Sequence, residues 1–76
     1  MKNFPRISLT KTGENITRLM EEAGLSVKDV QEAFGFQNPQ AIYKWKRGET
    51  LPSIDNLVAL AVLFHVTVDK IVVIEQ

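Results

Sequence analysis

Glycine and proline divide this chain into short segments, and this division limits the possible folds more than any other feature. The four glycines and three prolines recur at short intervals: Gly13, Gly24, Gly35, Gly48, Pro5, Pro39 and Pro52. Because both residue types interrupt regular structure, each intervening segment has room for about one short helix. The chain has 76 residues, the size of one domain, and no cysteine. Without disulfides or thiolate metal sites, a domain this small depends on well-packed helices.

The first two segments have the pattern of amphipathic helices. Between Gly13 and Gly24, apolar residues recur at helical spacing, and Gly24 is placed to end the helix in the left-handed conformation. These residues are Ile16, Leu19, Met20 and Ala23. A second helix is predicted to begin after Ser26, which can form a capping box with Asp29, and to end at Gly35.

Two further start signals predict the next two helices. Asn38 followed by Pro39 favours a helix from about Pro39 to Arg47, which Gly48 would end. Ser53 is the predicted N-cap of a fourth helix, and we expect this helix to be the most buried because it is so rich in apolar residues. They are Ile54, Leu57, Val58, Leu60, Ala61, Leu63 and Phe64.

The two ends of the chain allow more than one structure. Thr67 can cap a fifth, short helix with Val68, Ile71 and Val72, although the β-branched run 71–74 suits a strand equally well. Near the N-terminus, Ile7, Ser8 and Leu9 alternate as a short strand would. We therefore expect an all-α, compact five-helix domain, with a short β pairing of the two ends as the alternative for these residues.

The second and third predicted helices and the turn between them make a helix-turn-helix over residues 26–47. The motif and its surroundings resemble the lambda-repressor-like, Cro/repressor (xenobiotic-response-element) type of helix-turn-helix domain over about 13–72. The matching residues are Leu25, Ser26, Gly35, Ile42, Trp45, Arg47, Gly48, Pro52, Leu57, Leu60, Ala61, Val66, Thr67 and Asp69. The resemblance implies one DNA-binding domain over 1–76, with its core at about 13–72.

The chain departs from the family pattern at several positions. Val27 stands where the family often has a glutamine that approaches a phosphate, and Lys28 is the nearest substitute. Met20 and Lys46 replace an internal Arg–Glu ion pair. The turn at 36–38 holds one residue more than is common.

Charge is balanced in total but not in distribution. Nine basic and nine acidic residues give a net charge of zero, which by itself disfavours nucleic-acid binding. However, residues 33–48 contain Lys44, Lys46 and Arg47 and no acidic residue, and residues 1–12 contain Lys2, Arg6 and Lys11 and none either. The local distribution of charge is therefore more informative than the sum.

The third predicted helix has two different faces. Ala41, Ile42 and Trp45 form a packing face, with Trp45 as a core residue, while the opposite face carries polar residues at helical spacing. Gln and Lys can bond base edges in a major groove, and Tyr, Arg and Asn can hold phosphates. Backbone amides at Gln40 and Ala41 would favour a phosphate as well. The predicted DNA-binding residues are Lys28, Gln37, Asn38, Gln40, Ala41, Tyr43, Lys44, Lys46 and Arg47.

Other functions find little support in the sequence. There is no metal-ligand cluster, phosphate loop or activated nucleophile, so we expect neither an enzyme nor a cofactor, and we interpret His65 as partly buried packing. Residues 1–6 lack the apolar run of a signal peptide and no stretch is long enough to cross a bilayer, which predicts a cytoplasmic protein without membrane contact.

The favoured hypothesis is a sequence-specific transcriptional regulator that binds double-stranded DNA as a homodimer on a two-fold operator. Its dimer interface would be the apolar C-terminal end around Ile71, Val73 and Ile74. The alternative is a protein-interaction or antitoxin-like module that binds a partner protein through the fourth helix and the same apolar C-terminus.

Overall fold

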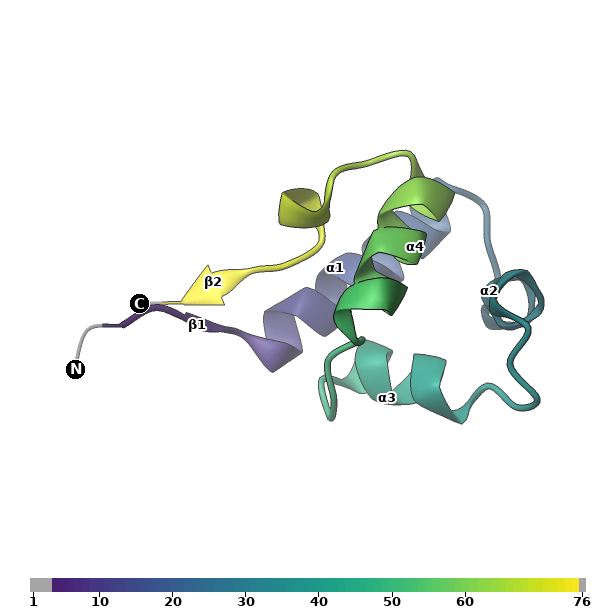
Figure 1. The fold of residues 1–76 in the computed structure, drawn as a ribbon, viewed down its shortest axis with the longest axis horizontal. Coiled ribbons are helices and arrows are strands. Elements are labelled where there is room, and N and C mark those ends of the chain that lie inside the picture. The colour runs from purple at the N-terminus through teal and green to yellow at the C-terminus, as the bar shows by residue number, and fades with distance from the viewer. Residues whose placement is uncertain (1–3, 76) are drawn as a thin grey trace.

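The computed structural model describes residues 4–75, which form four α-helices and a C-terminal segment that returns to the N-terminus (Figure 1). The elements are β1 (Arg6–Ile7), α1 (Leu9–Glu22), α2 (Val27–Phe34), α3 (Gln40–Arg47), α4 (Ile54–Phe64), a 3-10 helix (Val68–Lys70) and β2 (Ile74–Glu75). The expected helix-turn-helix architecture is confirmed. The expectation of five α-helices is wrong, because the segment after Thr67 makes only a 3-10 turn before it extends into β2.

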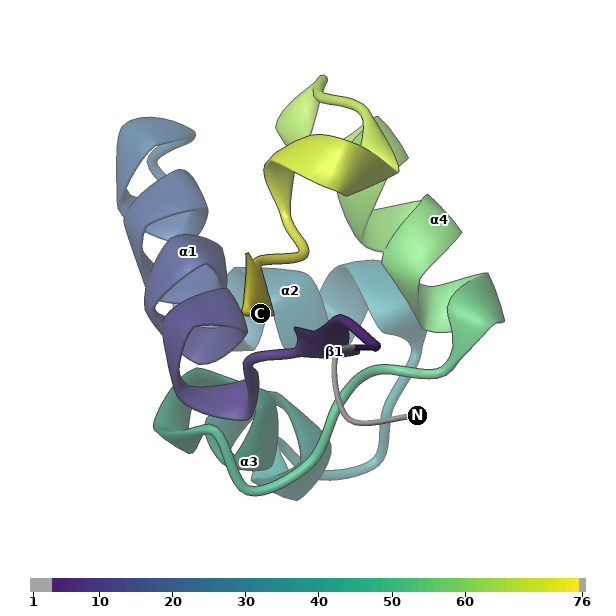
Figure 2. The same ribbon diagram turned by 90° about the vertical axis from the view of Figure 1, so that its left-hand side faces the viewer.

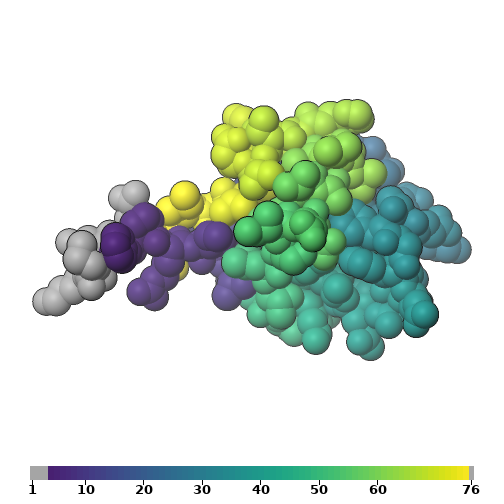
Figure 3. Space-filling model, viewed as in Figure 1, coloured from purple at the N-terminus to yellow at the C-terminus, as the bar shows by residue number. Residues whose placement is uncertain are grey.

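The two ends of the described chain pair as a short antiparallel ribbon. Arg6 lies opposite Glu75 and Ile7 lies opposite Ile74. Leu9, expected in this strand, is instead the first residue of α1, because the Ser8 hydroxyl accepts a hydrogen bond from the Lys11 amide (3.2 Å) and caps the helix. The ribbon extends away from the helices (Figures 1 and 3), and Figure 2 shows it end-on.

Helix α1 begins before Gly13, so this glycine lies inside the helix and is not its boundary. Gly13 is buried because α3 passes directly over it. A Cβ atom at this position would lie 2.5 Å from the carbonyl oxygen of Trp45 and 2.7 Å from that of Lys46. The missing side chain allows the backbones of α1 and α3 to touch, which fixes the position of α3.

Helix α2 has the predicted ends. The Asp29 amide donates to the Ser26 hydroxyl (3.0 Å), and the Ser26 amide donates to the Asp29 carboxylate (2.9 Å), so the capping box is complete. Gly35 ends the helix with φ 70°, the left-handed conformation that glycine adopts most easily.

The core contains side chains from all four α-helices and from the C-terminal segment. Its buried apolar residues are Ile16, Leu19, Met20, Val30, Ile42, Trp45, Leu60, Ala61, Phe64 and Ile71. Trp45 is a core residue as predicted, and its ring makes edge contacts with Phe34 (centroids 5.9 Å apart) and Phe36 (6.0 Å). Met20 packs in the core as well.

Helix α4 is not the most buried helix, contrary to expectation. It has three buried residues, whereas α1 has five. Ile54, Val58 and Val62 form an exposed line along α4, with 79%, 51% and 70% of their surface accessible. His65 is also exposed rather than partly buried, and it ends α4 in the left-handed conformation (φ 58°).

Polar side chains of α1 hold the C-terminal segment in place. The Asn15 amide nitrogen donates to the carbonyl oxygens of Lys70 (3.2 Å) and Ile71 (3.1 Å), and the Thr12 hydroxyl accepts from the Val73 amide (3.0 Å). The Ser8 amide donates to the Val73 carbonyl (2.7 Å), which leads directly into the ribbon. Among residues 4–75, no helix combines the length and apolar character needed to cross a bilayer.

Candidate nucleic-acid interface

Helix α3 presents one packed face and one exposed face, as its sequence predicted. Ile42 is fully buried, Trp45 is buried, and Ala41 is half-buried against the core. Gln40, Tyr43, Lys44 and Arg47 are exposed. In Figure 1, α3 lies along the lower edge of the molecule.

The turn before α3 differs from the predicted cap, because the N-cap residue is Pro39 and not Asn38. The Asn38 side-chain oxygen accepts a hydrogen bond from the Gln40 amide (3.1 Å), and α3 begins at Gln40, one residue later than expected. The Gln40 amide is therefore already bonded within the chain, contrary to the expectation that it would face a phosphate. Gln37, in the same turn, is exposed, as is Lys28 in the first turn of α2.

The last turn of α3 carries the three cations that the sequence grouped together. Lys46 is half-buried, and its Nζ lies 6.0 Å from the centroid of the Tyr43 ring, a cation–π distance. Lys44 is exposed. Arg47 is exposed as well, but its Nε is paired with the carboxylate of Glu49.

Glu49 is a feature of this site that the sequence reasoning missed. The left-handed conformation of Gly48 (φ 75°) turns the chain back, and the Glu49 amide donates to the Lys44 carbonyl (2.9 Å). The hydrogen bond from Arg47 lowers the pKa of Glu49, and the same bond raises the pKa of Arg47. Both groups are therefore charged at neutral pH. The only available signal was an acidic residue just beyond the helix-ending glycine.

The predicted DNA-binding residues come from two different helices and the turn between them. Those of the turn and of α3 form one continuous stretch, 37–47, whereas Lys28 is contributed by α2. Their contact with DNA stays a prediction, because exposure alone also fits a solvated helix face.

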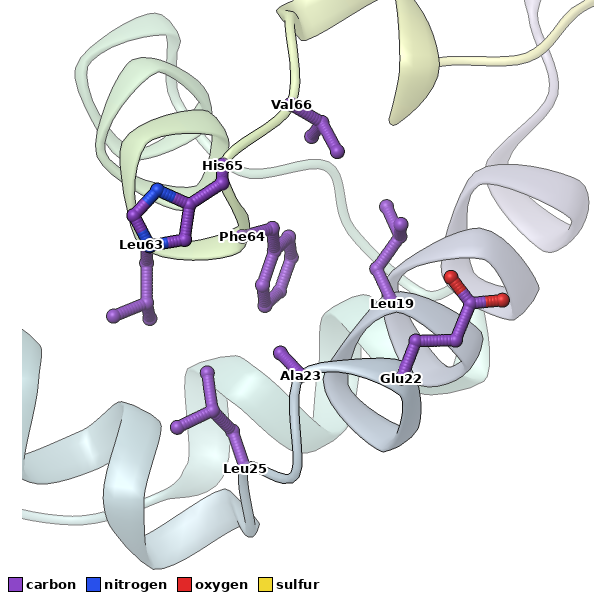
Figure 4. A pocket seen from close by; sticks show the side chains of 8 residues that line it. All are labelled: Leu19, Glu22, Ala23, Leu25, Leu63, Phe64, His65 and Val66. Atoms are coloured by element: carbon purple, nitrogen blue, oxygen red, sulfur yellow. The ribbon is translucent and has the colours of Figure 1, made fainter.

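A separate groove of about 480 Å³ lies between the ends of α1 and α4 (Figure 4). It is lined by Leu19, Glu22, Ala23, Leu25, Leu63, Phe64, His65 and Val66. The lining is largely apolar, and no residue of α3 contributes to it. Within the described part of the chain, no group of three or more His, Cys, Asp or Glu side chains is arranged to hold a metal ion.

The capped α2, its turn and the half-packed α3 define the class of protein as a helix-turn-helix domain. Comparison with protein families agrees, since residues 16–71 match the family model described as "Helix-turn-helix". The match spans well over half of the chain, and the chain belongs to the lambda-repressor/Cro-like helix-turn-helix family. This is a family of DNA-binding regulators and not of enzymes. No curated protein and no solved structure matched the chain.

Proposed function

We propose that the protein regulates transcription by binding specific DNA sequences, with α3 in the major groove. The observation that carries this proposal is the division of α3 into a face fixed by Ile42 and Trp45 and an exposed polar face. A major groove admits one helix, and the exposed side chains suit both base edges and phosphates. We propose the cytoplasm as its location, because a bacterial or phage regulator meets its DNA there.

The exposed residues divide into two proposed roles. Gln40 and Lys44 would read base edges, since Gln can bond adenine at two atoms and Lys can reach guanine O6 and N7. The remaining residues would hold phosphates or position the helix: Lys28, Gln37, Asn38, Ala41, Tyr43, Lys46 and Arg47. We treat residues 1–76 as one domain with a single DNA-binding surface.

Two substitutions distinguish reading from holding. A preferred site is first selected from genomic fragments with the purified protein, and binding is then measured by fluorescence titration. Gln40→Ala should cost about 1–3 kcal/mol on the preferred site and leave random DNA nearly unaffected. Arg47→Ala should weaken all duplexes alike and reduce the slope of log K against log salt by at most about one.

Thermal melts accompany both variants, so that a loss of binding is not mistaken for unfolding. If both variants stay folded and bind every duplex as the parent does, α3 is not the reading element. If the parent itself binds no duplex in a salt-dependent way, the DNA-binding proposal fails. The partner-protein alternative would then be favoured, and the exposed line Ile54, Val58 and Val62 on α4 would be its first candidate surface.

The second part of the proposal is a homodimer on a two-fold operator. One helix covers too few base pairs for tight specificity, so we expect half-sites about 10 base pairs apart. The expected interface needs correction. Ile71 is completely buried, and the Val73 amide donates a hydrogen bond to the Thr12 hydroxyl of α1. Of the predicted interface residues, only Ile74 is largely exposed, at 59%.

The ribbon supports a dimer that leaves α3 free. Ile7 and Ile74 lie directly opposite each other, so both side chains emerge from the same face of the ribbon. Two strands of two residues each are too short to be stable by themselves. The ribbon extends away from the helices (Figure 1), so we propose that a second copy joins there and not at α3.

A further inference from the structure

We propose that Glu49 limits the affinity of the protein for DNA by occupying the guanidinium of Arg47. DNA phosphate then has to compete with an internal carboxylate for the same cation. The inference rests on the proposed function, and it adds a residue that sets how tightly the protein holds any duplex.

The backbone places Glu49 beside the last turn of α3. Gly48 is left-handed, its amide donates to the Trp45 carbonyl (3.1 Å), and the Glu49 amide donates to the Lys44 carbonyl (2.9 Å). These bonds form the closure typical of helix C-termini, so the backbone of Glu49 is as fixed as the end of the helix itself. Its side chain therefore starts from a fixed point within reach of Arg47.

Glu49 lies beside a cluster of positive charges, so its own charge matters for the attraction of α3 to DNA. Lys44, Lys46 and Arg47 all lie in the last turn of α3, and the segment 33–48 contains no acidic residue. Glu49 is the first acidic residue after them, and the positive charge of Lys44 also favours its ionised form. One of the three positive charges at the end of α3 is thus neutralised by the chain.

The pair is accessible, so a phosphate can displace the carboxylate. The side chains of Arg47 and Glu49 are 56% and 49% exposed, and exposed ion pairs contribute little to stability. Guanidinium binds phosphate and carboxylate in the same forked geometry. The displaced Glu49 would nevertheless stay near the phosphate and repel it.

An internal counterion also changes the salt dependence. When a free cationic side chain meets a phosphate, a condensed ion is released from the DNA, and this release drives binding. The charge of Arg47 is already balanced by Glu49, which holds its Nε, so its contact yields less net attraction than that of an unpaired arginine. Removing the carboxylate should recover the full contact.

The variant Glu49→Gln tests the inference in the intact chain. It should bind every duplex more tightly than the parent, with the slope of log K against log salt steeper by up to about 0.9. The gain in affinity should therefore shrink by up to about 3.5-fold between 50 and 200 mM salt, since a fourfold change in salt is raised to that power.

The matched control is Glu22→Gln. Glu22 also forms an exposed ion pair, with Arg18 at 2.9 Å, and its substitution changes the net charge by the same amount. It lies at the end of α1, in the groove of Figure 4 rather than on α3. An equal gain in affinity in both variants would mean that net charge alone is responsible, and this would overturn the inference.

A double substitution tests whether Glu49 acts through Arg47. In an Arg47→Ala background, Glu49→Gln should improve binding no more than Glu22→Gln does. A gain as large as in the parent would show direct repulsion of DNA and would contradict the competition. If the parent binds DNA with normal salt dependence but Glu49→Gln binds identically, only this inference fails. If no variant binds any duplex, the proposed function fails and this inference with it.

Discussion

The close contact between α1 and α3 depends on one missing side chain. At an ordinary helix-interior position, alanine is more stabilising than glycine by about 0.5–1 kcal/mol. At Gly13 the added Cβ would meet two carbonyl oxygens of α3, at 2.5 and 2.7 Å. Because these are backbone atoms at the end of a packed helix, they cannot move aside as a flexible side chain can. The steric effect should therefore exceed the gain in helix propensity.

We expect Gly13→Ala to lower the free energy of unfolding by about 1–3 kcal/mol, the usual cost of overpacking. Urea denaturation followed by circular dichroism measures this change. The control is Glu14→Ala, at the exposed neighbouring position, where we expect a change of at most about 0.5 kcal/mol. A Gly13→Ala protein that is more stable than the parent would show that α1 and α3 are not in backbone contact.

Gly13 and Glu49 also show why the roles of some single residues could not be predicted from the sequence. Gly13 lies between a polar and an apolar segment, where a glycine ordinarily marks a helix boundary. Its actual role depends on Trp45 and Lys46, which are distant in the sequence. The pairing of Glu49 depends on the direction that the chain takes after Gly48. By contrast, the burial of Trp45 follows from the helical spacing and was predicted correctly.

Among the elements, α2 could be predicted in full because its signals are local. Ser26, Asp29 and Gly35 determine both ends through bonds that span at most a few residues. Helix α4 could be located from Ser53 but not oriented, since apolar residues surround its axis and no polar face indicates which side meets solvent. Of the run 71–74 only Ile74 lies in the ribbon, and its pairing partner is at the other end of the chain, so no local signal determines this structure.

The capping box of α2 should contribute measurably to stability. We expect Ser26→Ala to cost about 1 kcal/mol, since it leaves the Asp29 amide without its acceptor. Thermal and urea denaturation measure this loss. Ser26→Asp, which restores an acceptor at the N-cap, should recover most of it. An unchanged Ser26→Ala protein would mean that water replaces the cap without cost.

The same capping box should affect stability in acid. The hydrogen bond from the Ser26 amide lowers the pKa of Asp29 from its ordinary value, and the hydrogen bond with the Ser26 hydroxyl lowers it further. A carboxylate with a lowered folded-state pKa adds stability that is complete above its unfolded-state pKa of about 3.9. That stability is lost as the pH falls through the folded-state value.

The free energy of unfolding should therefore fall as the pH is lowered below about 4. In the Asp29→Asn variant this free energy should fall less over the same range than in the parent. Urea denaturation between about pH 2 and 5, at constant ionic strength, gives this comparison. The control Asp55→Asn removes a first-turn carboxylate from α4 instead. A parent and Asp29→Asn with the same pH dependence would contradict a role for the capping box in acid.

For the whole molecule, the ribbon determines how two copies can meet. Its exposed apolar surface is small, and a stable interface needs about 800 Å² from each partner. We therefore expect the free protein to be largely monomeric and to dimerise on its operator, where the DNA holds both copies. Sedimentation of the protein with and without the operator measures both states.

Two substitutions locate the interface. Ile74→Ser should prevent the second copy from binding cooperatively, whereas Val62→Ser should not, although Val62 is 70% exposed and equally apolar. The opposite result would move the interface to the exposed line on α4. A parent that stays monomeric when it is bound to its operator would exclude the homodimer.

The ribbon also has a consequence for the order in which the chain folds. Pairing residues 6–7 with 74–75 closes a loop that contains nearly the whole chain, whereas the bonds that cap α2 span three residues. Closing a longer loop costs more entropy, so contacts between distant residues form late and are the first to open. The amide hydrogen of Val73 should accordingly exchange with solvent sooner than that of Val30 in α2. We therefore expect the helix-turn-helix to fold early and the ribbon that would join two copies to form last.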